Sequence, residues 1–486
     1  MTVRQAQRTL GVVALASWIG CACAQDVPMH ATGADVMPAA AVPDTVRHPP
    51  ALSDSAALVI ALPALSAAEA TRMARRETSN GRFLMGLGRA TPEVGQPAEL
   101  AAKLRWHATA QGKKVTALRV ISPGALGLRL GVRLLHLPDA AVLRFFAPGA
   151  EQVQELSGAE VNASVRRNLA SGATGEAAEA YWSPLIPGEA LTLEIALPAG
   201  TDHRRVRVTL HRLSHFVQVP FDDAAQESPG AAPCEQQEPA CDPEWDYPSR
   251  ATAMLVHTDE AGDSSVCTGT LLNDSDPSTY VPYLLTAHHC VSEQARAWSV
   301  QTFWLYRSRR CGGGPDQVQT VPGGADLLYA SQLTDTALLR LRRPPPADVV
   351  FSGWSATLLA PGAAVVSVHH PRGGAQQIAV GALSAYRNCA DVNYCPDAAD
   401  SDASHYLETV WSTGVTAPGS SGAGLFLASG QLIGTLNGGF SRCDNPHGPD
   451  NFGRFDIPYQ DALHRWLGSV QSKGSTEAVQ RSSTGR

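Results

Sequence analysis

The stretch VTAPGSSGAGLF, from Val415 to Phe426, places two adjacent serines, Ser420 and Ser421, among small residues between a proline and an apolar run. Glycine and serine clusters of this kind are typical of turns between strands. The same residues also suit a nucleophilic serine, because glycines let backbone amides converge on one oxygen atom. The stretch alone leaves both interpretations open, so the rest of the chain must decide between them.

Candidates for a base and an acid lie upstream of this stretch. In YLLTAHHC an apolar strand ends at His288 and His289, and in SQLTDTALLRLRRP Asp335 comes directly before another apolar strand. Acyl transfer by a serine requires a base for the hydroxyl proton and an acid that orients the base. Taken singly, His289 could be structural and Asp335 could cap a turn. The order His, Asp, Ser favours catalysis and disfavours an α/β-hydrolase, in which acid and histidine follow the serine.

Bulk composition limits the class of protein. The chain has 486 residues, 44% of them apolar, and a net charge of −7 without blocks of like charge, so we expect two or three domains and no nucleic-acid partner. Residues 1–24 combine Arg4, Arg8, a short apolar run and small residues, which predicts a signal peptide. A lipid-attached Cys21 is the alternative. No later stretch has membrane-spanning length, so we expect a secreted monomer, with the periplasm as the alternative location.

The cysteines after the signal peptide indicate disulfides. An even number in an exported chain is typical of a disulfide framework, although eight cysteines allow about 100 pairings. Zinc is disfavoured because no CxxC pair occurs, and no cofactor motif is present. The double histidines His288–His289 and His369–His370 do not predict a metal site, because neighbours on a strand point to opposite faces. The eight cysteines are Cys234, Cys241, Cys267, Cys290, Cys311, Cys389, Cys395 and Cys443.

The pattern along the chain predicts two β-rich domains. Between 57 and 221, apolar residues alternate with polar ones, as in LGLRLGVRLLHLP from residue 126 and RRVRVTLHRL from residue 204. This alternation is typical of half-buried antiparallel strands and predicts a β-sandwich. The expected divisions are a signal peptide at 1–24, a flexible leader at 25–56, a β-rich domain at 57–221, an exposed linker at 222–233, a second β-rich domain at 234–468 that closes with a helix at 456–468, and a disordered tail at 469–486.

Three motifs carry a resemblance to a known family. TAHHC, TDTALLRL and PGSSGAGLF resemble the catalytic segments of chymotrypsin-fold serine proteases, and LTAHHC, GVTAPGSSG and NFGRFD are similar to the bacterial lysyl endopeptidase family. The resemblance covers about residues 230–468. It implies an all-β, two-barrel chymotrypsin-like protease domain with a C-terminal helix, preceded by a β-sandwich-like pro-domain. It also implies hydrolysis of protein or peptide substrates through an acyl-enzyme.

The resemblance assigns roles to individual residues. His289 would be the base, Asp335 the orienting acid and Ser421 the nucleophile, and the amides of Gly419 and Ser421 would form the oxyanion hole. His288 stands where the broader superfamily has alanine and receives no catalytic role. Because the base must be neutral to accept a proton, the rate should fall below about pH 6.5.

The same resemblance addresses substrate specificity. Position 415, where trypsin-like enzymes carry their specificity acid, is a valine. Asp450, in HGPDNFGRFD, matches the acid that binds the lysine side chain in the lysyl family, although it could simply form a turn. Trp411 matches an aromatic residue beside the pocket, although it could equally be core. Gly438 and Gly439 would leave backbone free for an extended peptide.

Asn437 and Ser420 depart from the expected patterns. Asn437 stands where the lysyl family has histidine, which weakens the claim of identical substrate contacts. The alternatives are the same fold with an arginine-inclusive or other specificity, and a non-catalytic secreted binding protein with a protease-like domain. Ser420 replaces the Asp that receives the new N-terminus in trypsin-like zymogens, so latency must come from elsewhere, and the protein's own propeptide at 57–221 is the candidate.

The resemblance implies the pairs Cys267–Cys290, Cys234–Cys443 and Cys241–Cys311, which leaves Cys389–Cys395.

Overall fold

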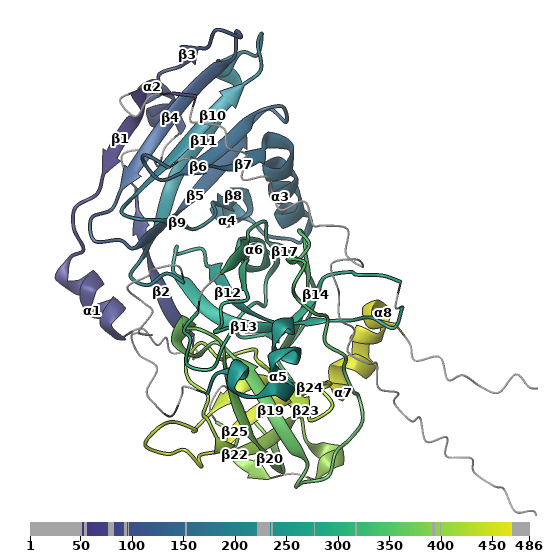
Figure 1. Ribbon diagram of the computed structural model, residues 1–486. Helices are drawn as coiled ribbons and strands as arrows, with labels where there is room; N and C mark the ends of the chain where they lie inside the picture. Colours follow the sequence, from purple (N-terminus) through teal and green to yellow (C-terminus); the bar gives the residue numbers. More distant parts are fainter. Residues whose placement is uncertain are drawn as a thin grey trace, which may run out of the picture.

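The computed structural model describes residues 51–468, apart from gaps at 53–55, 76–81, 92–94, 96, 151–152, 221–233, 235–236, 277, 316–317, 391–393 and 399 (Figure 1). The predicted signal peptide, the linker at 222–233, the tail at 469–486 and nearly all of the leader lie outside the described residues. Within the described part, no helix is both long enough and apolar enough to cross a membrane.

Six strands of the C-terminal part close into a barrel. They pair in the order β19 (Ala364–His369), β23 (Gly424–Leu427), β24 (Leu432–Gly439), β25 (Asp450–Arg454), β22 (Tyr406–Thr413) and β20 (Gln377–Asn388), and β20 pairs back with β19. The short β21 (Asp397–Ala398) extends from β20. The interior is apolar and includes Leu425, Trp411 and Phe452. Closure of this kind leaves no free sheet edge within the ring.

A second set of strands forms the other barrel of the protease part. The order is β16 (Gln319–Val321), β15 (Gln301–Trp304), β12 (Thr252–Thr258), β13 (Ser264–Leu272), β14 (Tyr283–Ala287), β18 (Thr336–Leu341) and β17 (Ala325–Ser331). Their shared core contains Leu255, Leu284 and Leu339, together with Cys267 and Cys290. The all-β, two-barrel architecture predicted from the sequence is therefore confirmed.

Two sheets make up the N-terminal region. One contains β1 (Leu58–Ala61), β3 (His107–Ala108), β4 (Lys114–Ile121), β6 (Val142–Phe146), β7 (Gln154–Ser157) and β10 (Ala190–Leu197). The other contains β2 (Phe83–Ala90), β5 (Gly127–His136), β8 (Ala180–Trp182), β9 (Ile186–Pro187) and β11 (Arg207–Phe216). The apolar faces predicted from the alternation, such as Leu128 to Leu134, pack into one core between the sheets.

Two predictions for this region were incomplete. β10 and residues 127–132 of β5 are buried on both faces rather than half-buried. The buried Glu194 of β10 is satisfied there, because its carboxylate accepts a hydrogen bond from Arg144 Nη1 at 2.7 Å. The alternation also hid four helices. The longest, α3 (Gly158–Ala170), begins with a capping box in which Ser157 and Glu160 each accept from the other's backbone amide. That Ser-x-x-Glu spacing was a readable signal. The others are α1 (Ala67–Arg75), α2 (Pro97–Lys103) and α4 (Gly175–Glu179).

The remaining helices are short. The predicted C-terminal helix is present as α7 (Asp456–Pro458), a π-helical turn at Tyr459–Leu463 and α8 (His464–Leu467), which Figure 1 draws beside the barrels. The others are α5 (Pro243–Asp246), α6 (Gln294–Ser299) and 3₁₀ turns at His203–Arg205, Pro239–Cys241, Pro248–Ala251, Pro371–Gly373 and Ser401–Ala403.

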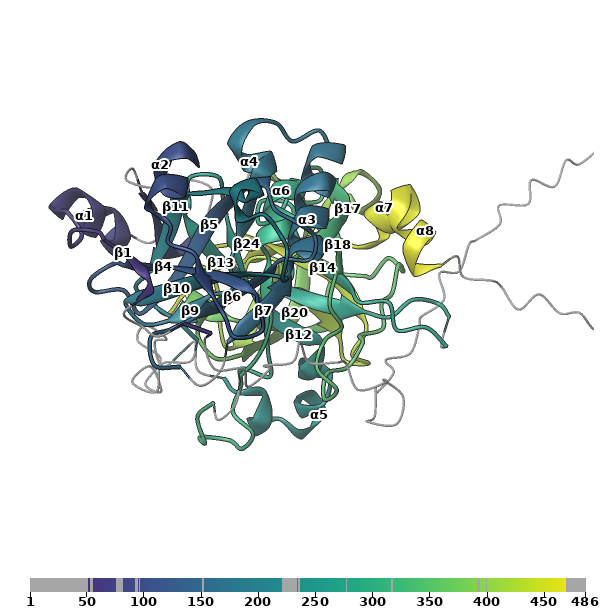
Figure 2. The same ribbon diagram turned by 90° about the horizontal axis from the view of Figure 1, so that it is seen from above.

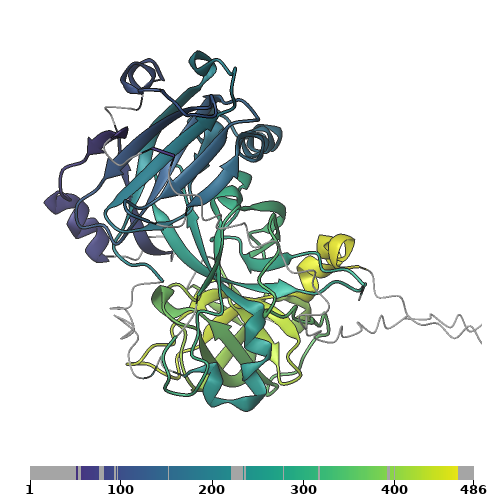
Figure 3. The same cartoon turned by 45° about the horizontal axis from the view of Figure 1, so that its top comes forward.

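The N-terminal region and the protease part share one continuous sheet. In β13, Ser264–Val266 pair with Gly86–Phe83 of β2 in antiparallel register, whereas Thr270–Leu272 pair with β14. Figures 1 and 3 show the N-terminal sheets stacked on one end of the barrels, and Figure 2 shows α3 close to α6. The buried guanidinium of Arg129, in β5, donates at 2.8 Å to Thr258 Oγ1 and to the Ser299 carbonyl. The two regions are therefore joined by backbone pairing and by buried polar contacts.

Candidate active site

His289 and Asp335 meet because their strands are neighbours. β14 ends at Ala287 and β18 begins at Thr336, and these two residues are paired in the antiparallel ladder. His289 Nδ1 lies 2.6 Å from Asp335 Oδ2, and the His289 amide donates to Oδ1 at 2.8 Å. A carboxylate only accepts, so Nδ1 carries a proton, and in the neutral imidazole Nε2 has the lone pair. Nε2 has no hydrogen-bond partner within the described part of the chain.

Asp335 is held in an unusual backbone conformation. Its φ is 47°, in the left-handed region that Asp tolerates better than most residues. The Asp335 carbonyl accepts from the His288 amide at 3.0 Å, and the side-chain amide of Asn437 donates to Oδ2 at 3.0 Å. Asn437 is thus a third donor to this carboxylate. Its deviation from the family pattern was noticed in the sequence, but its contact with Asp335 was not predicted.

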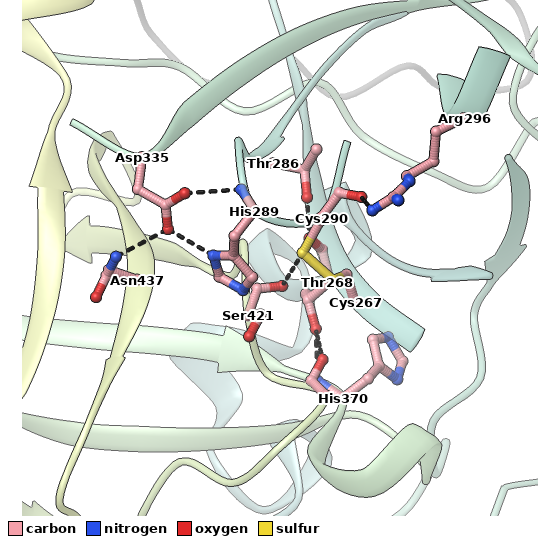
Figure 4. The surroundings of a disulfide bond; sticks show 11 residues. Cys267, Thr268, Thr286, His289, Cys290, Arg296, Asp335, His370, Ser421 and Asn437 are labelled. Atoms are coloured by element: carbon pink, nitrogen blue, oxygen red, sulfur yellow. Dashed lines mark hydrogen bonds and ion pairs between the residues drawn. A yellow bond between two sulfur atoms is a disulfide. The ribbon is translucent and has the colours of Figure 1, made fainter. Parts of the chain in front are cut away.

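The loop that carries Ser421 contacts β13 between the segment paired with β2 and the segment paired with β14. The Thr268 amide, between the β2-paired and β14-paired segments, donates to the Ser421 carbonyl at 2.8 Å. That carbonyl also lies 3.8 Å from Cys290 Sγ, which has no proton to donate because it forms a disulfide, so this approach is a packing contact. Figure 4 shows Ser421 beside the imidazole of His289. Ser421 itself is 7% exposed.

The two amides predicted for the oxyanion hole are oriented by neighbouring bonds. The Pro418 carbonyl accepts from the Arg372 amide at 2.7 Å, so in the trans peptide the Gly419 N–H points the opposite way. The Ser420 carbonyl, which shares a peptide unit with the Ser421 N–H, accepts from the Ala423 amide at 2.9 Å, so the Ser421 N–H points the other way. Among the described residues, no acceptor is paired with the amides of Gly419 and Ser421. Both amides therefore lack an intramolecular acceptor in the part of the chain that the structure describes.

Ser420 has a neutral partner where trypsin-like enzymes have an ion pair. Its hydroxyl lies 2.8 Å from His369 Nδ1 and accepts from the Ala417 amide at 3.2 Å. Burial lowers the pKa of His369 to about 3 and that of the adjacent His370 to about 4. Both imidazoles are therefore neutral at ordinary pH, and the loop is fixed by hydrogen bonds between uncharged groups. The contact between Ser420 and His369 was not predicted from the sequence.

Asp450 is completely buried and surrounded by donors. Its Oδ2 accepts from Trp411 Nε1 at 2.6 Å, Thr416 Oγ1 at 2.8 Å and Ser441 Oγ at 2.6 Å, and Oδ1 accepts from the Ser441 amide at 3.1 Å. Burial raises the pKa of Asp450, although the hydrogen bonds from Ser441, Trp411 and Thr416 oppose that rise. Thr416 and Ser441 were not identified from the sequence.

Trp411, Gly438 and Gly439 all lie next to Asp450. Trp411 is 1% exposed and packs on Phe452, so it is a core residue that also donates to the carboxylate. On one edge of β24, Gly438 and Gly439 pair with Asn451 and Asp450. A side chain at Gly439 would start 2.1 Å from Asp450 Oδ1. A glycine is therefore required at this position if the carboxylate is to keep its place.

The disulfides connect the elements around this site. The structure forms the three pairs that the resemblance implied, Cys234–Cys443, Cys241–Cys311 and Cys267–Cys290, and also the remaining pair, Cys389–Cys395. Cys267–Cys290 links β13 to the residue after His289. Two clusters of potential metal ligands, one with His257 and one with Glu238, each contain two of these disulfide cysteines, which are not free thiolates.

Comparisons with known proteins agree along most of the chain. Residues 231–453 match a family model described as lysyl endopeptidase, C-terminal domain, and residues 61–217 match the lysyl endopeptidase N-terminal domain. A lysyl endopeptidase of Pseudomonas aeruginosa is 33% identical over 402 residues, which cover 79% of this chain and 80% of the relative.

Solved structures give partial matches only. An HtrA-type protease, AlgW, with a tripeptide is 20% identical at a TM-score of 0.30, and the match covers 44% of this chain and 60% of that chain. AlgWS227A with a decapeptide is 15% identical at a TM-score of 0.29, and the match covers 45% of this chain and 64% of that chain. In both cases the match spans less than two thirds of the solved chain.

Proposed function

Since this chain belongs to the lysyl endopeptidase family and is a serine endopeptidase, we propose that it is secreted and hydrolyses peptide bonds after lysine through His289, Asp335 and Ser421. The observation that carries the proposal is the 2.6 Å contact between His289 Nδ1 and Asp335 Oδ2, beside the docked Ser421 loop. This contact fixes the tautomer that a general base needs.

The reaction proceeds in two halves. His289 Nε2 takes the Ser421 hydroxyl proton as the oxygen attacks the substrate carbonyl, and the amides of Gly419 and Ser421 bind the resulting oxyanion. The tetrahedral intermediate collapses, the C–N bond breaks, and the imidazolium gives its proton to the leaving amine. Water then attacks the acyl-enzyme with the same base, which releases the acid and restores Ser421. Each oxyanion donor contributes roughly 3–4 kcal/mol to lowering the barrier.

Lysine preference is proposed from Asp450. A buried anionic carboxylate whose neighbours are neutral hydrogen-bond donors is matched by a cationic substrate side chain, and a neutral side chain would leave the charge without a counter-charge. The family of the chain supports the choice of lysine. Asp450 lies in β25 and pairs with Gly439 of β24, the strand that contains Asn437, and this position is consistent with a role in binding the substrate side chain.

The N-terminal region is proposed to be the propeptide that keeps the enzyme latent. β2 occupies the edge of β13 up to Val266, two residues before Thr268, which holds Ser421. At about 3.3 Å per residue, β2 ends roughly 7 Å along the strand from the nucleophile loop. An extended peptide leaving the reactive serine along this edge would meet β2, so the region is suited to exclude substrate.

The same region is proposed to assist folding of the nucleophile loop. Gln218 Nε2 donates to the Arg372 carbonyl at 2.8 Å, and Arg372, at a φ of 53°, orients the Pro418 carbonyl. A contact from the N-terminal region thereby supports a turn that stores strain and that positions the Gly419 amide.

A covalent probe tests the catalytic assignment independently of substrate choice. A fluorophosphonate should label the secreted enzyme once, and peptide mapping should find the adduct on Ser421 and not on Ser420. Ser421→Ala should remove both labelling and proteolysis, whereas Ser412→Ala, which changes an exposed hydroxyl, should retain both. Labelling of Ser420, or retained activity in Ser421→Ala, would reject the assignment.

Digestion of a protein mixture tests specificity. Mass spectrometry should find peptides that end uniformly in lysine, and Asp450→Asn should lose this preference. Mixed arginine and lysine ends would instead support the broader specificity. No cleavage at all, with Ser421→Ala behaving identically, would support a binding protein.

Deletion of residues 57–221 tests the propeptide role. Export of the truncated chain should yield no active enzyme, and co-expression of the N-terminal region as a separate chain should restore some activity. Full activity of the truncated chain alone would disprove the proposed role.

A further inference from the structure

The lysines of the chain are confined to its N-terminal region and its tail. They are Lys103, Lys113, Lys114 and Lys473, so residues 115–472, which include the whole protease part, contain none. An enzyme that cuts only after lysine therefore cannot cut its own protease part or the connection to the N-terminal region. Separation of the two regions would need an endopeptidase of another specificity, whereas the enzyme's own cuts in the described part of the chain would fall between 103 and 115.

These three lysines lie on one peripheral segment of the N-terminal region, residues 97–113, and at the start of the strand that follows it. The segment runs from α2 through β3 to the turn before β4, and Figure 1 draws α2 and β3 at the end of the molecule opposite the barrel of β23 and β24. Because the continuous sheet joins the two regions, an active site in the same folded chain cannot reach this segment. Any cut here is therefore made by a second enzyme molecule.

The bond after Lys103 has little regular structure on either side. Lys103 is exposed and ends α2, a helix of seven residues, and residues 104–106 belong to no helix or strand. Proteases bind extended chain and cut exposed segments that unfold locally. Extension here breaks the 3.0 Å bond from the Leu104 amide to the Leu100 carbonyl, but a helix this short is only marginally stable. The segment can thus open while β4 and β10 stay paired.

The other two lysines are better protected. Lys114 lies in β4, which at this position pairs with β10 on one side and with β3 on the other. Its ammonium lies 3.0 Å from His203 Nδ1. The Lys113 carbonyl accepts from the Thr109 amide at 2.8 Å, within the turn. Cleavage after either lysine therefore requires that the end of β4 leave both neighbouring strands.

We propose that the Lys103–Leu104 bond is a processing site, at which an active copy of this enzyme cuts the N-terminal region of another copy. The inference rests on the proposed lysine preference. Hydrolysis consumes one water and leaves the carboxylate of Lys103 and the amino group of Leu104. The N-terminal region is thus a substrate of the enzyme that it keeps latent, while the protease part resists the same activity.

The cut weakens the N-terminal region from within. Leu100, on one side of the bond, is buried, and Leu104 and Trp106, on the other side, pack against the core between the two sheets. Once the chain is broken between them, each side can leave the core separately. β3 stays attached through its ladder with β4 and through the Trp106 ring, whose centroid lies 5.5 Å from that of His203. The cut after Lys113 then follows and frees residues 104–113.

A time course with intact chains tests the inference. Full-length Ser421→Ala protein, which cannot cut itself, is incubated with a trace of the active secreted enzyme, and mass spectrometry identifies the fragments. The first new N-terminus should be Leu104, the peptide 104–113 should follow, and no cut should appear between 115 and 468. A first cut at any other position of the intact chain overturns the inference.

Two conservative variants of the substrate chain give a matched comparison. Lys103→Arg keeps a long cationic side chain at the exposed end of α2, and it should slow the loss of the intact N-terminal region at least tenfold. Lys113→Arg should leave the rate of the first cut unchanged. Equal rates for Lys103→Arg and its parent overturn the inference.

A synthetic peptide of residues 97–110 separates failure of this inference from failure of the proposed function. It contains one lysine, Lys103, and one arginine, Arg105, in a chain too short for a stable fold. Cleavage of the peptide after Lys103, without cleavage of the intact chain there, overturns the processing site and leaves the lysine preference in place. A peptide that is also cut after Arg105, or is not cut at all, contradicts the proposed lysine preference itself.

Discussion

Replacing Ser420 by alanine should uncouple the nucleophile loop from the core beneath it. The hydroxyl is the partner of His369 Nδ1 and of the Ala417 amide, at 2.8 and 3.2 Å. Ser420 and His369 have no exposed surface, so water cannot take over either bond. An unsatisfied buried donor or acceptor costs about 1–3 kcal/mol. Because the Ala417 bond is long, we expect a total loss of about 3 kcal/mol in the free energy of unfolding.

A double-mutant cycle measures the His369 part of this loss. Urea unfolding is followed in full-length Ser421→Ala protein, which cannot digest itself, with Ser420→Ala, His369→Leu or both added. Removing both partners of a buried hydrogen bond costs less than leaving one unsatisfied. The coupling free energy should therefore reach about 1–2 kcal/mol. In the active background, Ser420→Ala should lower kcat by about tenfold or more, toward the cost of losing one oxyanion donor.

The reasoning fails if Ser420→Ala unfolds within about 0.5 kcal/mol of its parent, the range of ordinary surface substitutions, and if the cycle shows no coupling. Ser412→Ala, which removes a hydroxyl that donates to the Val380 carbonyl in an exposed position, serves as the control.

Three further predictions follow from the same geometry. The folded state keeps His369 and His370 neutral down to about pH 3 and 4, whereas unfolded histidines bind protons below about pH 6.5. The free energy of unfolding should therefore fall as pH is lowered, by up to about 4 kcal/mol at pH 5. Urea unfolding midpoints measured at pH 7 and pH 5 check this prediction, and equal midpoints would contradict it. Asn437→Ala removes a hydrogen-bond donor to the charged Asp335, and such a bond contributes about 1.5–3 kcal/mol. The variant should lower kcat/KM about 10- to 100-fold and move the acid limb of the pH profile of kcat/KM. An unchanged pH profile would show that Asn437 does not position the carboxylate. Gly422 has a φ of 83°, and Gly422→Ala would place a Cβ 2.4 Å from the Thr268 carbonyl oxygen. The variant should therefore lower the free energy of unfolding by more than about 1 kcal/mol in urea unfolding. An unchanged free energy of unfolding would mean that the loop can move away from the added methyl group.

Local sequence patterns predicted the strands and the loops that bear the site. Alternation marked the core-facing residues of β5, although its other face is also largely buried, and the apolar runs before His289 and after Asp335 became adjacent strands. The convergence of those two residues follows from the antiparallel pairing of β14 with β18. The family resemblance implied that the residues act together, but the local patterns did not predict that pairing.

Contacts between distant segments were not predictable in the same way. The bond of Ser420 to His369 joins residues 51 positions apart, and the β2–β13 pairing joins segments separated by most of the N-terminal region. No periodicity encodes such a partner. α3 is a different case, since its capping box lay in the sequence but was overlooked among alternating residues. Asn437 was considered only as a departure from the family's histidine, and its side-chain amide was not predicted to donate to Asp335.

The common sheet has a consequence for maturation. If the N-terminal region is removed as proposed, cutting the connecting segment would not by itself detach it, because the β2–β13 ladder and the Arg129 bonds persist after scission. Catalytic turnover should then lag behind chain cleavage by the lifetime of a nicked complex. Dilution, or degradation of the severed piece, would set the pace of activation.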